Sequence, residues 1–288
     1  MRVEIEILGS GTSSGIPTIG CDCPVCRSHN PRNKRLRASV LFRVSQPGLP
    51  GQPAAETRLL VDVTPDVRIQ ALRAGFSSVQ GVLITHTHAD HCHGLDDLRG
   101  LYWGGGREPI DLWGYPESIA SLKRTFEYIF DLEYDYKGVA RLEPHEFDQA
   151  AFVVAGVTVT PIQVVHGKMR VAGFRVGDAA YITDCNEVPP ASIEKLRGVK
   201  LLVLDALRRA PHPTHMSLPA ALKVAQQIGV QKVFFTHINH DLEHEAVSAE
   251  LPPWAGLGYD MLRAAVEENG SITVKEPAPR PNPPVVSW

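Results

Sequence analysis

The feature that most constrains this chain is a short run of metal-binding side chains directly after the apolar segment 82–84. The run reads Thr85-His86-Thr87-His88-Ala89-Asp90-His91. Extended residues alternate sides, so His86 and His88 share one face, while Asp90 and His91 follow on the next turn and can reach a second centre. The run holds three of the chain's 12 histidines, so a polar loop with incidental histidines is the weaker interpretation. We predict a metal site with room for two ions.

Short apolar segments alternate with amphipathic helical segments along most of the chain. The expected strands are 3–8, 39–44, 58–62, 82–85, 157–165, 180–183, 201–204 and 232–236. Apolar residues recur at the three- and four-residue spacing of helices in 65–74, 116–131, 191–197, 217–228 and 258–268. This alternation predicts an α/β fold, and the 43% hydrophobic content is enough for a large core.

No internal repeat or linker divides the sequence, so we expect one domain over residues 1–275, with a boundary near 145 as the weaker alternative. Three prolines between Gln46 and Glu56 predict an exposed loop that joins two strands. Five prolines in 276–288 predict an extended tail outside the fold.

Charge and hydropathy indicate which cellular compartment and which kinds of binding partner to expect. No run reaches membrane-spanning length, and the alternating N-terminal segment does not resemble a targeting signal, so we expect a cytoplasmic protein. The net charge of -3 gives no general attraction to nucleic acid or to anionic membranes. A small-molecule substrate is therefore favoured, with neither nucleic acid nor membrane as a partner.

Three further donors each follow a predicted strand: His166, Asp184 and His237. Any one of them alone would be an ordinary polar residue at a strand end. Together with the histidine-rich run they would supply the additional ligands that a two-metal site needs. We therefore expect these strand ends to converge on the first loop.

A second candidate metal site lies near the N-terminus. Cys21, Cys23 and Cys26, three of the five cysteines, fall within six residues. This spacing is too tight for most disulfides but suits tetrahedral zinc in a reducing compartment. A closed structural site needs a fourth ligand, for which His29 is near in sequence and His240 is the preferred candidate. The alternative is three free buried thiols.

The metal-binding pattern resembles the metallo-β-lactamase fold superfamily, whose signature His-x-His-x-Asp-His is intact and is followed by His, Asp and His in the family order. The resemblance covers nearly the whole chain and implies a four-layered αββα sandwich. It implies that one divalent metal is held by His86, His88 and His166, that a second is held by Asp90, His91 and His237, and that Asp184 bridges both.

The cysteine cluster, preceded by the glycine-rich segment 9–17, resembles the phosphoribosyl cyclic phosphodiesterase (PhnP-like) branch, near the tRNase Z endonucleases. In that branch the matching cysteines and a histidine form a structural zinc site, here with His240. The pyrroloquinoline quinone synthesis branch has a similar cluster but departs at the His-x-His positions, which this chain keeps. We find no long basic arm of the kind that grips tRNA. A strand-connecting loop explains the glycine-rich segment equally well.

The resemblance implies that a hydroxide held between two metals attacks a phosphodiester. His215 matches the family position of a general acid that protonates the leaving oxygen, and Asp205 would orient it, with His212 as the local competitor. Asp90 completes the expected catalytic set as a metal ligand. Without the family match, His215 also suits the N-terminal capping region of the helix that begins near Ser217.

Several residues are candidates for supporting roles. Asp62 matches an aspartate that props the ligand loop, or serves as a carboxylate at a helix N-terminus. Cys92 and Cys185 each follow a proposed ligand, although burial explains them as well, and the phosphodiesterase relatives would have threonine in place of Cys185. Binding potential is assigned to three tyrosines: Tyr128, Tyr134 and Tyr136.

Three functions stay open on this evidence. The first is a dinuclear phosphodiesterase for small diesters, either cyclic nucleotide-like or ribosyl cyclic. The second is a dinuclear hydrolase of a lactone or other carbonyl compound, or a cofactor-synthesis enzyme like that of pyrroloquinoline quinone synthesis. The third is a zinc-dependent binding protein. The donors suit zinc, manganese and iron alike, and the superfamily resemblance implies a homodimer as one form of assembly.

Overall fold

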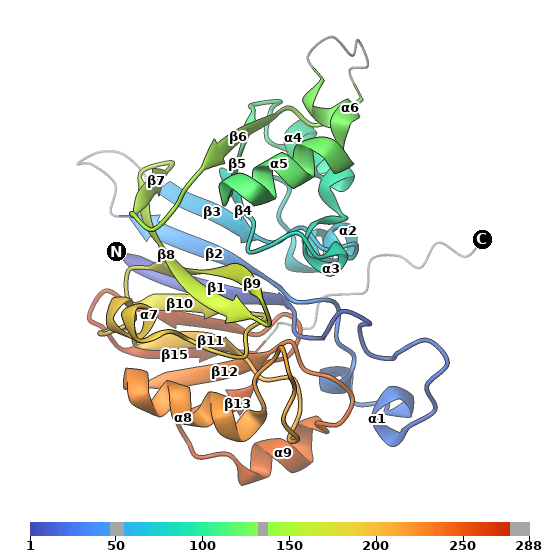
Figure 1. The fold of residues 1–288 in the computed structure, drawn as a ribbon, viewed down its shortest axis with the longest axis vertical. Helices are drawn as coiled ribbons and strands as arrows, with labels where there is room; N and C mark the ends of the chain where they lie inside the picture. Colours follow the sequence, from blue (N-terminus) through green and yellow to red (C-terminus); the bar gives the residue numbers. More distant parts are fainter. Residues whose placement is uncertain (47–54, 132–137, 277–288) are drawn as a thin grey trace.

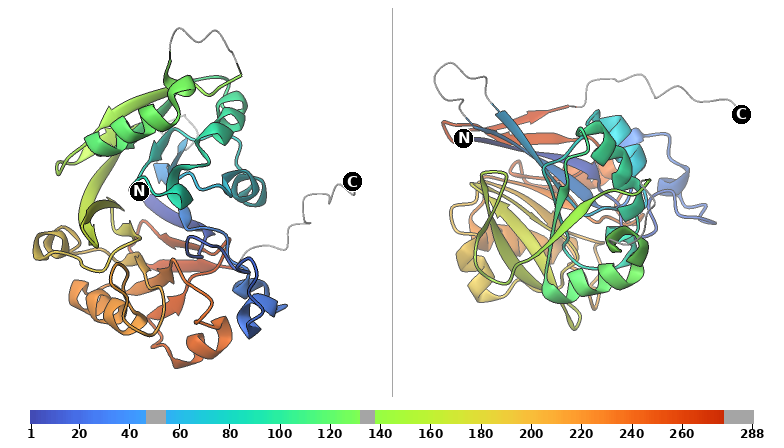
Figure 2. Two further views of the ribbon diagram at one scale, coloured as in Figure 1. Left: turned by 45° about the vertical axis from the view of Figure 1, so that its right-hand side comes forward. Right: turned by 90° about the horizontal axis from the view of Figure 1, so that it is seen from above.

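A computed structural model of the chain describes residues 1–46, 55–131 and 138–276. Within them, two mixed β-sheets lie face to face, with helices on the outer side of each (Figure 1, Figure 2). The first sheet has the strand order β15-β14-β1-β2-β3-β4-β5-β6, and the second has the order β13-β12-β11-β10-β9-β8-β7. The predicted αββα sandwich is confirmed.

The strands of the described residues are β1 (Arg2–Gly9), β2 (Ser39–Gln46), β3 (Ala55–Val61), β4 (Gly81–Leu83), β5 (Ile110–Gly114), β6 (Leu142–Glu146), β7 (Phe152–Val154), β8 (Val157–His166), β9 (Met169–Val176), β10 (Ala179–Ile182), β11 (Leu201–Asp205), β12 (Lys232–Thr236), β13 (Ala255–Leu257), β14 (Arg263–Val266) and β15 (Ile272–Lys275). The helices are α1 (Pro24–Arg27), α2 (Val67–Ala74), α3 (Ala89–Cys92), α4 (Leu98–Gly104), α5 (Pro116–Thr125), α6 (Glu127–Phe130), α7 (Pro190–Lys195), α8 (Leu218–Ile228) and α9 (His244–Glu250), with short 3-10 turns at Pro31–Asn33 and Leu95–Asp97. None of these helices has the length and apolar content needed to cross a bilayer.

The central layer is formed by side chains that point to one face of each strand, while the residues between them point to the other face. Ile5 of β1 and Phe42 of β2 point into the space between the sheets, where they meet Phe174 of β9 and Tyr181 of β10. The residues that alternate with them on β1 face the other way, as Glu6 does when its carboxylate pairs with the Arg43 guanidinium at 2.8 Å. Both faces of β1 are therefore buried.

The outer faces of the two sheets are covered by separate groups of helices. On the first sheet, α2, α4 and α5 pack on the strands through a buried cluster that includes Val67, Leu98 and Ile119. On the second sheet, α7, α8 and α9 do the same through a cluster that includes Ile193 and Ala225. The two clusters and the central layer make up the four-layered core.

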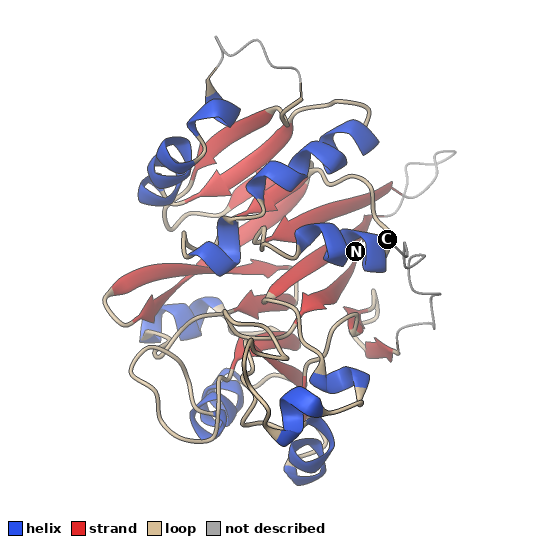
Figure 3. Cartoon of the chain, turned by 90° about the vertical axis from the view of Figure 1, so that its right-hand side faces the viewer, coloured by secondary structure: helices blue, strands red, loops and turns tan. Residues whose placement is uncertain are grey.

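Strand direction brings the functional loops to one edge of the sandwich. In the first sheet β3 and β4 run parallel, and in the second β10, β11 and β12 run parallel. β8 has the same direction as β10, because both pair antiparallel to β9 between them. Loops that leave the carboxyl ends of these strands therefore meet, and Figure 3 shows connecting loops, drawn in tan, in front of the strands.

The eight predicted strands coincide with strands of the structure, but the predicted helix 258–268 is wrong. That segment holds a turn followed by β14, where Ala265 pairs with Glu4 and Val266 pairs with Val3 of β1. Apolar residues on both sides of this short strand have helix-like spacing, whereas pairing with a strand more than 250 residues earlier decides its conformation. The predicted helix 116–131 is divided at Phe126 into α5 and α6.

Three predictions fall partly or wholly outside the described residues. The ends of the predicted loop between Gln46 and Glu56 belong to strands, because Gln46 pairs with Ala55, and 47–54 are not described. Tyr134 and Tyr136 also lie outside the described residues, as does the predicted tail from 277 onward.

Candidate metal centre

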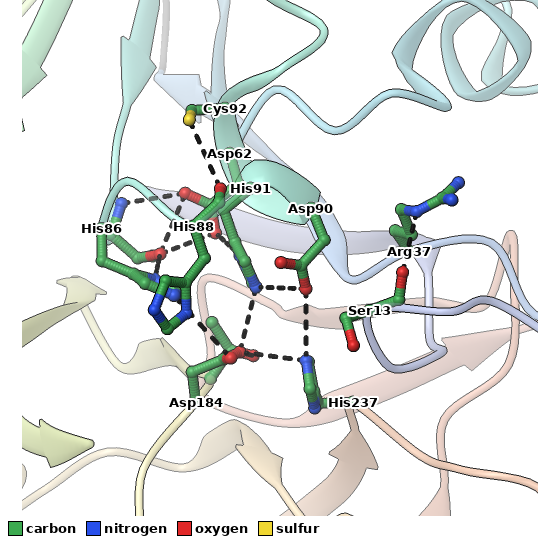
Figure 4. A network of polar contacts seen from close by, with 12 residues as sticks. Ser13, Arg37, Asp62, His86, His88, Asp90, His91, Cys92, Asp184 and His237 are labelled. Carbon is green, nitrogen blue, oxygen red and sulfur yellow. Dashed lines mark hydrogen bonds and ion pairs between the residues drawn. The ribbon is translucent and has the colours of Figure 1, made fainter. Parts of the chain in front are cut away.

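The structure brings the seven predicted metal ligands together at the strand ends, where all are buried except the half-buried Asp90 and the exposed His88. Figure 4 shows six of them, His86, His88, Asp90, His91, Asp184 and His237. Their donor atoms form two groups, within each of which all atoms lie within 4.8 Å of one another. The first group is His86, His88, His166 and Asp184, and the second is Asp90, His91, Asp184 and His237. Asp184 belongs to both groups, which is the arrangement expected of a ligand shared by two ions.

Unusual backbone conformations direct the side chains of three residues toward the site. Asp62, Asp184 and His237 have positive φ angles of 64°, 47° and 57°. Each comes within two residues of the end of β3, β10 or β12. Left-handed backbone is costly for residues with a side chain and is concentrated at functional sites. The sharp turn allows each side chain to point back between the two sheets.

A hydrogen-bonded chain from Asp62 sets the tautomers of two histidines. Asp62 accepts a bond of 2.7 Å at Oδ2 from His91 Nδ1, and it also accepts bonds from the Thr85 hydroxyl. The Thr85 oxygen in turn accepts from His86 Nδ1 at 3.0 Å. Both histidines therefore present Nε2, with its lone pair, to the interior of the cluster. Thr85 is a functional residue that the sequence reasoning missed.

His166 is fixed by a different partner. Its Nδ1 donates to the backbone carbonyl of Thr214 at 2.7 Å. This bond ties a ligand on β8 to the loop that carries His215, the predicted general acid. Because the partner is a carbonyl group, no side chain in the sequence signalled the role of Thr214.

The inward-facing nitrogen atoms lie close to carboxylates but have no hydrogen-bond partner. His91 Nε2 is 3.2 Å from Asp90 Oδ2 and 3.2 Å from Asp184 Oδ1, and His237 Nε2 is 3.3 Å from the same Asp184 atom. His86 Nε2 is 3.8 Å from Asp184 Oδ2. All three Nε2 atoms are buried without a hydrogen bond among the described residues. Buried polar atoms are rarely left so, and metal coordination would satisfy them.

Electrostatics favours cations in this cluster. Burial disfavours a charged Asp184, yet the neighbouring His237 and His91 imidazoles hold the pKa of its carboxyl well below the ordinary value. At Asp90, too, burial disfavours the charged form, but contacts with His237 and His91 outweigh it and lower the pKa of the carboxyl. Burial and the adjacent His91 lower the pKa of His86 well below its ordinary value, so this imidazole is a neutral ligand. At His91 and His237, burial disfavours the charged ring, but Asp184 outweighs it and raises the pKa of both imidazoles. This cluster of carboxylates therefore favours positive charge, which divalent metal ions bound by carboxylates and imidazoles would supply.

His215 lies beside the cluster. Asp205 places one carboxylate oxygen 3.3 Å from His215 Nδ1, and its other oxygen accepts from the backbone N–H of Met216 at 2.8 Å. The His215 ring stacks on His237 with centroids 4.6 Å apart, and its centroid is 4.7 Å from that of His166. It therefore contacts a ligand from each group. The competitor His212 belongs to neither group of donor atoms.

The cysteine cluster forms a separate group of donors. Cys21, Cys23, Cys26 and His240 have donor atoms within 4.8 Å of one another, and His29 is not among them. His240 Nδ1 is 3.4 Å from the Cys21 sulfur and 3.6 Å from the Cys26 sulfur. Three sulfurs and one imidazole nitrogen are the donor set of a closed tetrahedral zinc site.

The remaining candidate residues, Cys92, Cys185 and Tyr128, make contacts outside the two groups of predicted metal ligands. The Cys92 thiol donates to the Thr87 and His88 carbonyls, and burial raises its pKa to about 12. Cys185 lies in the apolar cluster under α7 and α8, where burial raises the pKa of its thiol well above the ordinary value. Neither sulfur belongs to a donor group. The Tyr128 hydroxyl donates to Asp96 at the surface.

Comparison with known proteins defines the family. A family model described as a beta-lactamase superfamily domain matches residues 57–238. The chain therefore belongs to the metallo-β-lactamase superfamily, and its fold and donor set are those of a metal-dependent hydrolase of that class.

Its relatives place it near the PhnP and tRNase Z branches. The crystal structure of a diphosphatase from the PhnP family is 40% identical, with a TM-score of 0.81 over 92% of this chain and 97% of that one. A ribonuclease Z from Mycobacterium sp. (strain KMS) is 28% identical over 95% of this chain and 99% of its own length.

Two further relatives have names that refer to other activities. A protein named octanoyltransferase in Porphyromonas gingivalis is 36% identical over 94% of this chain and 53% of its own length, so the chain spans about half of that relative. Coenzyme PQQ synthesis protein B from Methylobacterium nodulans is 36% identical over 70% of this chain and 72% of its own length.

Proposed function

We propose that this protein is a dinuclear metal-dependent phosphodiesterase that acts on small phosphodiesters, cyclic nucleotide-like or ribosyl cyclic ones above all. The observation that supports the proposal is the position of the buried Asp184, whose carboxylate belongs to both groups of predicted metal ligands at once. Zinc and manganese both suit the imidazole and carboxylate donors. His86, His88 and His166 would hold one ion, Asp90, His91 and His237 the other, and Asp184 both.

When bound, a pair of divalent ions lowers the pKa of water and offsets negative charge on phosphoryl oxygens. The protein supports that chemistry by holding its donors in place before substrate arrives. Asp62 fixes the ring of His91 directly and that of His86 through Thr85, and the Thr214 carbonyl fixes His166. Rings fixed in this way do not need to reorganise during the reaction.

His215 is proposed as the proton donor to the leaving oxygen. Its Nδ1 faces Asp205, so Nε2 is the nitrogen available to substrate. The buried Asp205 carboxylate stabilises the protonated ring, and its bond from the Met216 N–H keeps that carboxylate in place. We assign His215 and Asp205 the roles of general acid and positioning residue.

The choice of a phosphodiester rests on two supports. The PhnP-family diphosphatase is a solved relative that aligns over nearly the whole chain, and its name states a reaction at phosphorus. The net charge of -3 does not favour a long polyanion such as tRNA, although a ribonuclease Z is also a relative. The relative from PQQ synthesis supports the second candidate function, in which the same metals act on a different type of substrate.

The proposal is tested first with zinc- or manganese-loaded protein and a panel of cyclic and aryl phosphodiesters beside lactones. We expect hydrolysis of at least one diester at a rate that depends on added metal. Hydrolysis of lactones with no diesterase activity would favour the carbonyl alternative. Bound zinc without any hydrolysis would favour a zinc-dependent binding protein.

The second test uses leaving groups of different basicity with the His215→Ala variant. Loss of the acid should slow cleavage of an alkyl diester by about 100-fold or more, because a basic alkoxide needs a proton as it leaves. A nitrophenyl diester should react nearly as fast as with the unchanged protein. His212→Ala is the matched control and should behave like the unchanged protein with both substrates. An equal loss on both diesters would show that His215 does not act as the acid.

The cysteine cluster is proposed as a structural zinc site with Cys21, Cys23, Cys26 and His240 as ligands. The short sulfur-to-imidazole distances support it. Backbone N–H groups also point at two of the sulfurs, from Thr18 to Cys26 and from Cys26 to Cys23, as they do around thiolate ligands.

A further inference from the structure

Asp205 and His215 belong to a further group of donor atoms beside the two groups of predicted metal ligands. This group also contains Asp184 and His237, and its four donor atoms all lie within 4.8 Å of one another. Asp184 and His237 are shared with the predicted ligands of the second ion, whereas Asp205 and His215 belong to neither of the first two groups. The same part of the molecule therefore offers donors for one more cation.

The two donors that are unique to this group have the spacing that a single metal ion requires. Asp205 Oδ1 lies 3.3 Å from His215 Nδ1. Two atoms that each bind zinc at about 2.0 Å, with a tetrahedral angle between the bonds, lie about 3.3 Å apart. The Asp205 side chain is fully buried and only 11% of the His215 side chain is exposed, so water competes little for either atom.

His237 adds an unused donor next to the same carboxylate oxygen. Its Nε2 faces Asp184 at 3.3 Å, whereas its Nδ1 lies 3.8 Å from Asp205 Oδ1, which is too long for a hydrogen bond. This buried Nδ1 has no hydrogen bond among the described residues. The His215 and His237 rings stack at an interplanar angle of 14°. One oxygen of a buried carboxylate thus faces two ring nitrogens, an arrangement that a cation would satisfy.

We propose that Asp205 and His215, together with the shared Asp184 and His237, form an inhibitory position for a further divalent ion such as zinc. Because two of its four donors also serve the second ion, this inhibitory position binds zinc more weakly. It fills only when free zinc exceeds what the pair of ions needs.

The inhibition, although not the binding, rests on the proposed phosphodiesterase function. An ion on His215 Nδ1 takes the place of the proton that this nitrogen holds in the acid form. The ring then stays neutral, and its remaining N–H is far too weak an acid to protonate a leaving oxygen. Excess zinc should therefore remove the general acid without removing the pair of ions.

Equilibrium dialysis against zinc, followed by elemental analysis, tests the binding without an activity assay. At high free zinc the unchanged protein should bind one zinc ion more than His215→Ala, and at low free zinc both should bind the same number. His212→Ala is the matched control and should keep the extra ion. Its ring centroid is 5.2 Å from that of His215, yet it offers no donor to this group. If His215→Ala fails to fold, Asp205→Asn removes the other unique donor and should lose the same ion.

Hydrolysis of two diesters tests the inhibition. With an alkyl diester, saturating zinc should slow the unchanged protein by about 100-fold, the loss expected when the general acid is missing. A nitrophenyl diester, whose leaving group needs no proton, should lose less than about twofold. His215→Ala should show no further loss on the alkyl diester when zinc is raised.

The outcomes separate this proposal from the proposed function. Equal zinc content of the unchanged protein and His215→Ala at high free zinc would overturn the inhibitory position while leaving the phosphodiesterase intact. Equal inhibition of both diesters by zinc would overturn its action on the general acid. Failure to hydrolyse any diester would reject the proposed function itself, and the dialysis would still decide whether the further ion binds.

Discussion

The two candidate metal clusters of this chain are built in opposite ways. The His and Asp cluster lies between the sheets on the ends of strands, and its inward nitrogens are buried without partners. The cysteine cluster is carried by a loop and the single turn of α1, and only Cys26 of its members is buried. Its own apolar core consists of Ile16, Val25 and Cys26.

This difference shows which cluster depends on the fold and which depends on an ion. The cores of both sheets hold the first cluster in shape, including its left-handed residues Asp62, Asp184 and His237. Nothing of comparable size holds the cysteine cluster, so the proposed zinc would supply its stability. Metal loss should therefore inactivate the first cluster without unfolding it, and loosen the second without direct effect on catalysis.

The largest effect is expected from Asp184→Asn. Loss of the shared carboxylate should reduce kcat on the order of 1000-fold, because it weakens the hold on both proposed ions and their stabilisation of the transition state. The unfolding temperature should change little. The matched control is Asp178→Asn, a half-buried carboxylate that pairs with Lys200 at 2.9 Å outside both groups of predicted metal ligands. Activity within tenfold of the unchanged protein would contradict a bridging role.

Asp62→Asn should have an intermediate effect. The amide no longer provides a carboxylate for His91 and Thr85, so we expect metal affinity at the first cluster to fall by about 10- to 100-fold. Titration with zinc, followed by activity, measures this loss. Asp111→Asn is the control, since Asp111 also pairs with a histidine, His145 at 3.0 Å, outside the first cluster. Unchanged affinity would show that Asp62 does not support the ligands.

The smallest effect on activity is expected from Cys23→Ser. The variant should bind one zinc ion fewer than the unchanged protein. It should also lose about 4 kcal/mol of unfolding free energy when the unchanged protein is kept at free zinc near 1000 times the Kd. Its kcat at 25 °C should stay within about threefold, because Arg35 independently holds the segment after His237 through the Asn239 and Leu242 carbonyls. Calorimetry and zinc analysis, with His29→Ala as the control that retains zinc, measure both properties. A loss of kcat as large as that of Asp184→Asn would contradict the separation of the clusters.

The same contrast explains what the sequence could predict. The residues His86, His88, Asp90 and His91 are local in the chain, so their spacing alone indicated a site. His166, Asp184 and His237 were predicted because each follows a predicted strand and because the superfamily resemblance implies ligands in that order. The helix predicted at 258–268 was wrong because pairing with β1, a contact distant in sequence, determines that segment.

Supporting contacts were harder to predict than ligands. The Thr214 carbonyl that fixes His166 is a backbone group, and every residue type has one. The Thr85 hydroxyl stood inside the motif, but its role became visible only when the structure placed Asp62 beside it. The glycine-rich segment 9–17 connects β1 to the cysteine cluster and supplies no donor to either group of predicted metal ligands, in agreement with the interpretation as a strand-connecting loop.

Anomalous X-ray scattering from crystals of the zinc-loaded protein, recorded on both sides of the zinc absorption edge, tests the central claim most directly. We expect two peaks, one on each side of the Asp184 carboxylate, and a third among Cys21, Cys23, Cys26 and His240. A single peak among the histidines, or two peaks of which Asp184 contacts only one, would contradict the shared-ligand centre on which the proposed hydrolysis depends.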